Sequence, residues 1–187
     1  DDFLDGHRDA DGNFLVLDGV SWEGIRNDSR VLQFNLGASG INFDFTDQSQ
    51  TYEDIEAAFK QVRDALWIGQ NCGKEITFYV SRQIASNLER NSSEFASSEN
   101  KILQRLTGLE GVKEIKVTNK MTGNEMMGFP LDSSIIRPLV GMGINTVALP
   151  RPLYNSNYEF AVWGATGFQV RTDFTGQTCV IYCADMG

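Results

Sequence analysis

The segment TYEDIEAAFKQVRDALWIG (51–69) constrains the fold more than any other part of this sequence. Its apolar residues recur at helical spacing along one face, from Ile55 through Phe59 to Leu66. Thr51 stands where a helix cap is needed, and Asp54 follows three positions later, as in a capping box. The pattern predicts an amphipathic helix, and its apolar face must be covered by another element of the same domain.

Strand and helix patterns alternate after this helix. EITFYV (75–80) has the β-branched and aromatic composition of a strand. Two shorter helices are predicted, one over 82–90 after a capping Ser81 and one over about 99–107. A half-exposed strand is expected within 111–120, and MTGNEMMG (121–128) predicts a turn. Four more strands are predicted towards the end of the sequence: 144–149, 158–163, 167–172 and 177–183.

These patterns predict an α+β fold, a mixed β-sheet with two to three flanking helices. CVIYC (179–183) is apolar on both faces, which indicates a strand that is covered on both sides. We expect residues 51–187 to form the α+β domain and residues 1–50 to be an irregular, β-containing segment packed on it. Strands are predicted in that segment at 13–19 and, as two alternating patches, within 29–45. A turn at 174–176 is expected to pair the last two strands of the sequence.

The charge and the cysteines narrow the classes of function. The 187 residues carry a formal net charge of −9, which disfavours binding to phosphate backbones. The sequence contains no apolar run long enough to span a bilayer, and its acidic start does not resemble a targeting peptide, so we expect a cytosolic origin. Three cysteines, an odd number, favour free thiols in a reducing compartment. Cys179 and Cys183 would lie roughly 13 Å apart along a strand, too far to bridge.

Candidate chemistry is sparse. The sequence has a single histidine, His7, and its cysteines lack the spacing of a zinc site. We therefore expect no catalytic residue, no metal and no cofactor. One alternative stays open, a hydrolase or ligand-binding domain that uses a carboxylate pair or the tryptophans Trp22, Trp67 and Trp163.

The order of three segments resembles the axial domain of the major capsid proteins of tailed bacteriophages. GKEITFYVS leads into the short helix RQIASNLER, and ILQRLTGLEGVKEIKVTNKM follows after a loop. YNSNYEFAVWGATGFQVRTDFTGQTCVIYCADM is similar to the closing strands of that family. The resemblance covers roughly residues 50–187. The N-terminal arm, extended loop and long spine helix of the family are not recognisable, so we expect an excised, processed or shortened portion.

The resemblance implies a structural protein of the virion and not an enzyme. Copies of the chain would self-associate into capsomers of an icosahedral shell that encloses a phage genome and is assembled in the host cytoplasm. Scaffolding or portal proteins would be further partners, with no specific nucleic-acid recognition and no membrane. Loops 91–100 and 119–128 would meet their copies around a five- or sixfold axis. The expected inter-subunit contacts are Glu94, Phe95, Met126 and Met127. A nanocompartment shell protein of the same fold is the nearest alternative.

Overall fold

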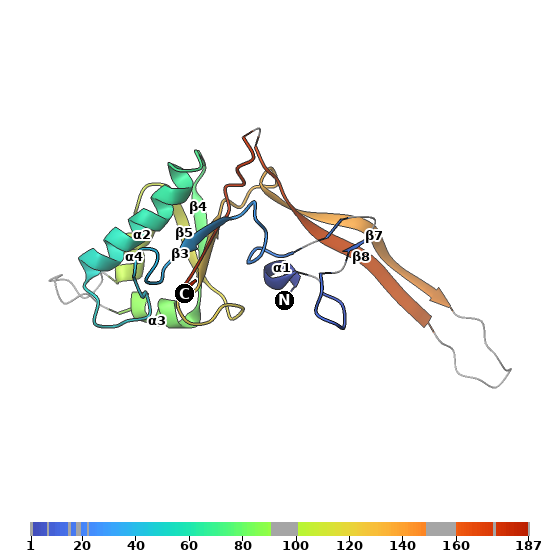
Figure 1. The fold of residues 1–187 in the computed structure, drawn as a ribbon, viewed down its shortest axis with the longest axis horizontal. Coiled ribbons are helices and arrows are strands. Elements are labelled where there is room, and N and C mark those ends of the chain that lie inside the picture. The colour runs from blue at the N-terminus through green and yellow to red at the C-terminus, as the bar shows by residue number, and fades with distance from the viewer. Residues whose placement is uncertain are drawn as a thin grey trace.

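The computed structural model is built around a five-stranded mixed sheet (Figure 1). It describes residues 2–6, 8–14, 16–17, 20–21, 23–90, 101–148, 160–173 and 175–186. The strand order is β3-β9-β6-β4-β5. The pairs β3–β9 and β4–β5 are parallel, and β6 is antiparallel to both of its neighbours. The five strands are β3 (Leu32–Asn35), β4 (Ile76–Val80), β5 (Val112–Val117), β6 (Met126–Phe129) and β9 (Ile181–Ala184).

Three helices cover one face of this sheet. They are α2 (Tyr52–Trp67), α3 (Arg82–Leu88) and α4 (Ile102–Thr107). The Thr51 hydroxyl accepts a hydrogen bond from the Asp54 amide at 3.2 Å, and Ser81 caps α3 through the Ile84 amide, also at 3.2 Å. The apolar face of α2 packs on the sheet, where Phe59 and Phe78 have ring centroids 4.7 Å apart. Burial of this face stabilises α2 in the fold.

The opposite face of the sheet is covered by the N-terminal part of the chain. Figure 1 shows α1 (Asp2–Asp5) on the side of the sheet away from α2. Leu4, Ile25 and Val31 form a second apolar cluster there with strand residues that include Met127 and Tyr182. A short hairpin of β1 (Val16–Leu17) and β2 (Val20–Ser21) belongs to the same N-terminal region.

A polar cluster centred on Arg26 lies beside this second apolar cluster. The Arg26 guanidinium donates to the Glu125 carboxylate at 2.9 Å and to the Tyr182 hydroxyl at 3.1 Å, and it also pairs with Asp5. The Tyr182 hydroxyl donates to Glu125 at 2.9 Å. Burial and the negative charge of Glu125 raise the pKa of Tyr182 to about 12.

A long two-stranded ribbon projects from the body of the molecule (Figure 1). Its strands, β7 (Ile136–Ala148) and β8 (Phe160–Val170), are antiparallel and pair only with each other among the described strands. The register shifts between Val140 and Met142 and again between Met142 and Asn145. Such irregularities bend a strand and increase its twist. We call the ribbon of β7 and β8 the arm.

The structure confirms the predicted α+β class and the main helices. The predicted helix 51–69 is α2, and the predicted strand 75–80 is β4. Within the predicted run 179–183, residues 180–183 are buried between the two clusters and Cys179 is partly buried.

Several predicted strands and turns are wrong in extent or pairing. The predicted strands 158–163 and 167–172 form the single strand β8 within the described residues, and β7 begins well before residue 144. The turn near 174–176 does not pair the last two strands, because β8 pairs with β7 while β9 pairs with β3 and β6. Only Leu32–Asn35 of the 29–45 region is a strand; Phe45 is fully buried but lies in a turn.

Candidate self-association surface

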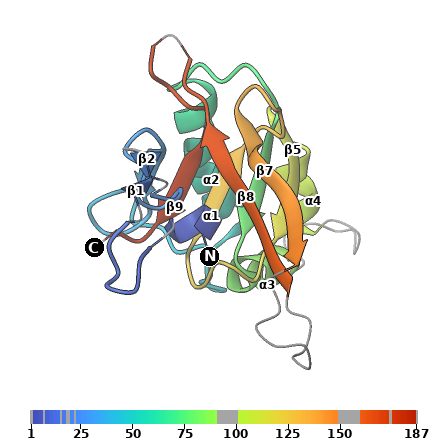
Figure 2. The ribbon, with the colours of Figure 1, turned by 90° about the vertical axis from the view of Figure 1, so that its right-hand side faces the viewer.

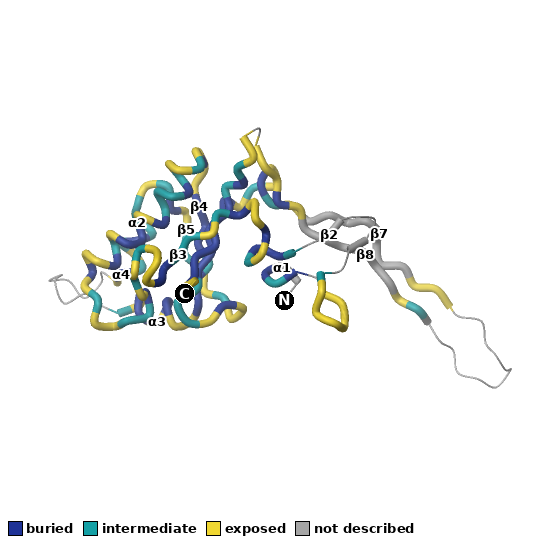
Figure 3. The backbone as a smooth tube through the Cα atoms, viewed as in Figure 1, coloured by how far each residue is buried: buried dark blue, intermediate teal, exposed yellow. Residues whose placement is uncertain are grey.

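The described outer part of the arm, residues 146–148 and 161–162, is more exposed than the sheet and helices of the body. Figure 3 shows buried backbone concentrated in the sheet and helices, whereas the described outer part of the arm is mostly exposed. Figure 2 looks at the molecule from the arm's side and shows β7 and β8 in front of the sheet. An isolated two-stranded ribbon is marginally stable in water, because it buries little apolar surface. The arm therefore gains stability if a further surface packs against it.

Both faces of the outer arm expose an apolar side chain. Val162 is 65% exposed and stands opposite Thr146, whereas Val147 is 44% exposed and stands opposite Ala161. Directly paired residues of antiparallel strands share a face, and successive residues alternate between faces. Val162 and Val147 therefore lie on opposite faces, so a partner can gain apolar contact from either side.

The base of the arm is fixed to the body. Ile135 and Val170 are buried in the second apolar cluster, and the Arg171 amide donates to the Ile135 carbonyl at 2.8 Å. The Lys74 ammonium pairs with Asp132 and donates to the Ser134 hydroxyl at 2.9 Å. This pairing holds the pKa of Asp132 well below its usual range. The arm thus projects from a fixed point next to the α2–β4 connection.

The structure separates the four residues that were predicted as inter-subunit contacts. Glu94 and Phe95 lie outside the described residues, as does His7. Met126 and Met127 were expected in an exposed loop, but they lie in β6 and are 0% and 6% exposed. Met126 packs into the helical-side cluster and Met127 into the opposite one. The loop placement is therefore corrected: β6 is a strand paired with β4 and β9 along its two edges, and an apolar cluster covers each of its faces.

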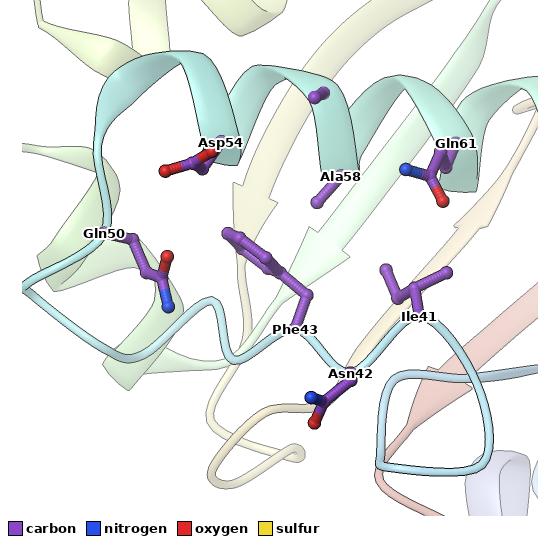
Figure 4. Close-up of a pocket in the computed structure, with 8 residues that line it drawn as sticks. Ile41, Asn42, Phe43, Gln50, Asp54, Ala58 and Gln61 are labelled. Carbon is purple, nitrogen blue, oxygen red and sulfur yellow. The ribbon is translucent and has the colours of Figure 1, made fainter.

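One surface pocket of about 350 Å³ lies between α2 and the loop that precedes it (Figure 4). Figure 4 shows the Phe43 ring directed toward α2. The pocket contains a single carboxylate, Asp54, whose oxygen accepts from the Thr51 hydroxyl at 2.6 Å. A hydrolase of the two-carboxylate type needs a second carboxylate across the reacting bond. This pocket does not supply one. Its lining residues are Ile41, Asn42, Phe43, Gln50, Asp54, Ala57, Ala58 and Gln61.

Other candidate sites receive no support from the described residues. Those residues contain no group of three or more His, Cys, Asp or Glu side chains that could hold a metal ion. No helix in the described part of the chain is long and apolar enough to cross a membrane. Trp67 packs near Arg63, with the guanidinium carbon 5.4 Å from the ring centroid, and takes no part in the pocket. The structure does not describe Trp22 or the side chain of Trp163.

The fold is similar to that of two solved shell proteins. A chain of the capsid of Myoviridae phage XM1 matches with a TM-score of 0.63 and 14% identity, over 97% of this chain and 57% of that chain. A chain of the virus-like particle from Pyrococcus furiosus matches with a TM-score of 0.54 and 14% identity, over 86% and 58%. The present chain thus spans less than two thirds of either relative. At this identity the likeness establishes a capsid-type fold.

Comparison of the sequences identifies a family. None of the curated proteins matches this chain. A family model matches residues 1–183, nearly the whole sequence. The chain therefore belongs to the family of unknown function DUF6260.

Proposed function

We propose that this chain is a non-enzymatic structural subunit of a phage capsid, which associates with copies of itself into the capsomers of an icosahedral shell. The observation that carries the proposal is the likeness of its fold to a chain of the phage XM1 capsid over 97% of the present chain. The projecting arm supports it, because the exposed Val147 and Val162 on opposite faces of its outer part are suited to contact with neighbouring copies.

The same proposal includes the surroundings of the shell. The formal net charge of −9 is suited to a wall that does not hold on to the enclosed genome. As a phage capsid subunit, the chain would assemble in the host cytoplasm, with scaffolding or portal proteins as further partners. Glu94 and Phe95 are kept as proposed contacts between copies, whereas the buried Met126 and Met127 are not.

A nanocompartment shell is the second candidate. The likeness to the virus-like particle from Pyrococcus furiosus favours it, because that relative shares the fold to a similar extent. The two candidates differ in what the particle encloses. Particles that contain nucleic acid favour the phage capsid, and particles that contain a defined protein favour the nanocompartment.

Self-association of the purified chain is the first test. We expect light scattering to report a mass that rises with concentration, and negative-stain images to show closed shells or rings of five- or sixfold symmetry. A monodisperse monomer at every concentration would contradict the proposal.

A second experiment tests the arm itself. We expect the double variant Val147→Asp and Val162→Asp to weaken association at least about tenfold, because an interface that buries these positions must then desolvate two carboxylates. The control is Ile68→Asp on the body, at the C-terminal end of α2. Ile68 is 70% exposed, which is similar to the 65% of Val162. Association that is equal in the double variant and the parent would remove the arm from the contact surface. An equal loss in the control would show that the effect is not specific to the arm.

A further inference from the structure

Two cysteines from distant parts of the sequence meet beside the sheet. Cys72 lies in the connection between α2 and β4, and Cys179 lies just before β9. Cys72 belongs to the helical-side cluster and Cys179 packs against it. The two thiols lie near enough for each to shift the pKa of the other. An independent contact joins the same two segments, since the Cys179 amide donates to the Gln70 side-chain oxygen at 3.2 Å. Both thiols are free.

The environments of the two thiols differ. Cys72 is 1% exposed, whereas Cys179 is only partly buried. The contact with Cys179 and burial raise the pKa of Cys72. The hydrogen bond from Cys72 lowers the pKa of Cys179, and the nearby charge of Lys74 acts in the same direction. Cys179 is therefore both the more accessible thiol and the one that ionises first.

The backbone at Cys179 is also unusual. Its φ of +51° lies in the left-handed region, which costs free energy for a residue other than glycine. A glycine or asparagine would occupy this position with less strain. The structure nevertheless has a cysteine at this strained position, near Cys72. Backbone strain of this type often accompanies functional positions.

We propose that Cys72 and Cys179 form a reversible disulfide within one chain when the protein meets an oxidising environment. The third cysteine, Cys183, is fully buried in β9 and stays reduced. This inference goes beyond the proposed shell function and does not depend on it.

The oxidant is a small disulfide of the glutathione class. The Cys179 thiolate attacks one sulfur of the small disulfide, forms a mixed disulfide and releases one small thiol. Cys72 then loses its proton, and its sulfur attacks the sulfur of Cys179. The Cys72–Cys179 bond forms as the second small thiol leaves and takes up a proton. Two protein thiols are oxidised to one disulfide, and one small disulfide is reduced to two thiols.

The bond would join the ends of a segment of roughly a hundred residues. That segment contains the arm and every described strand from β4 to β8. One end lies next to β9, which pairs with both β3 and β6 in the sheet. The crosslink therefore restricts the unfolded chain strongly, and we expect it to stabilise the folded one.

The test equilibrates the full chain in glutathione buffers from fully reduced to fully oxidised and then alkylates the remaining thiols. Trypsin places Cys72 in the peptide 64–74 and the other two cysteines in the peptide 172–187. We expect the oxidised protein to lose two of its three reactive thiols and to yield these peptides as a linked pair. We also expect its melting temperature to exceed that of the reduced protein by on the order of 10 °C.

Three variants assign the bond. Cys72→Ala and Cys179→Ala should abolish both the linked peptides and the oxidative rise in melting temperature, whereas Cys183→Ala, the matched control, should keep both. Three alkylated thiols in the oxidised parent, a bond through Cys183, or a bond between two chains would each overturn the proposal. If a variant fails to fold, the thiol count and the two melting temperatures of the parent, together with the mapping of Cys183→Ala, decide the question.

Discussion

Arg26 is the residue at which three parts of the chain meet. It contacts Asp5 in the N-terminal segment, Glu125 before β6 and Tyr182 in β9. Its guanidinium is 27% exposed, so water screens these interactions only in part. Because charged groups that lose their partner in a partly buried site are costly, the cluster holds the N-terminal segment on the sheet.

We expect Arg26→Ala to lower the free energy of unfolding by about 1–3 kcal/mol, since it leaves the Glu125 and Asp5 carboxylates without this cation. Urea unfolding measures the change. Arg82→Ala, on the exposed start of α3, is the control and should change the free energy by less than about 0.5 kcal/mol. Equal stability of the Arg26 variant and the control would show that the cluster contributes nothing measurable.

The raised pKa of Tyr182 predicts that the free energy of unfolding falls at alkaline pH. Its pKa is raised to about 12 in the folded chain, mainly by burial and then by Glu125, whereas an unfolded tyrosine titrates near 10. Stability from this group is complete below pH 10 and is lost as the pH rises towards 12, by about 2 kcal/mol. Tyr182→Phe should flatten this part of the pH profile in urea unfolding between pH 9 and about 12. An unchanged slope in the variant would assign the alkaline loss to other groups.

At the scale of elements, the packing of β6 depends on the close approach of the Gly128 backbone to the Phe78 side chain of β4. Gly128 is paired with Phe78 of β4 and with Ile181 of β9. A Cβ atom at this position would lie 2.7 Å from a ring carbon of Phe78 and 3.2 Å from the Ile181 side chain. Phe78 is fully buried and packs on Phe59, so its ring has little room to move.

We therefore expect Gly128→Ala to destabilise the chain by about 1–3 kcal/mol through overpacking. Gly73→Ala, in the α2–β4 connection, is a matched control, because a Cβ atom there meets nothing within 4 Å. Thermal unfolding of the two variants provides the comparison. Similar melting temperatures for both would mean that the Phe78 ring yields at little cost.

At the scale of the whole molecule, a compact body carries a long arm. Two apolar clusters, one on each face of the sheet, stabilise the body. Among the residues whose burial is described, the arm contributes to them at its base, through Ile136 and Val170. Regions with few buried apolar contacts open more easily than a core. The arm is therefore the part of the described chain whose stability should respond most to association.

Hydrogen exchange should show this difference. In dilute, unassociated protein we expect the amides of outer β7 and β8 to exchange much faster than those of β4 and β9. Association should slow exchange in the arm and leave the strands of the body unchanged. Equal protection of arm and body in the dilute protein would show that the ribbon is stable by itself.

Local patterns in the sequence determined the elements that depend on local physics. The period of apolar residues and the caps at Thr51 and Ser81 identified α2 and α3, because a helix forms its hydrogen bonds within one segment. The apolar run 179–183 identified a strand with both faces covered, and its residues 180–183 are buried. The resemblance of segment order to tailed-phage capsid proteins identified the capsid-type fold that the structural comparison supports.

Only the tertiary structure decided which strands pair and which side chains are covered. The sequence placed Met126 and Met127 in a turn, although the run Met-Met-Gly-Phe is apolar on both faces, because nothing local shows that β4 and β9 lie on either side of it. The arm was missed as a unit for the same reason, since β7 and β8 are defined by their pairing. The contact between Cys72 and Cys179 also joins distant segments. Strand pairing and contact across a fold depend on long-range closure of the chain, which no local pattern encodes.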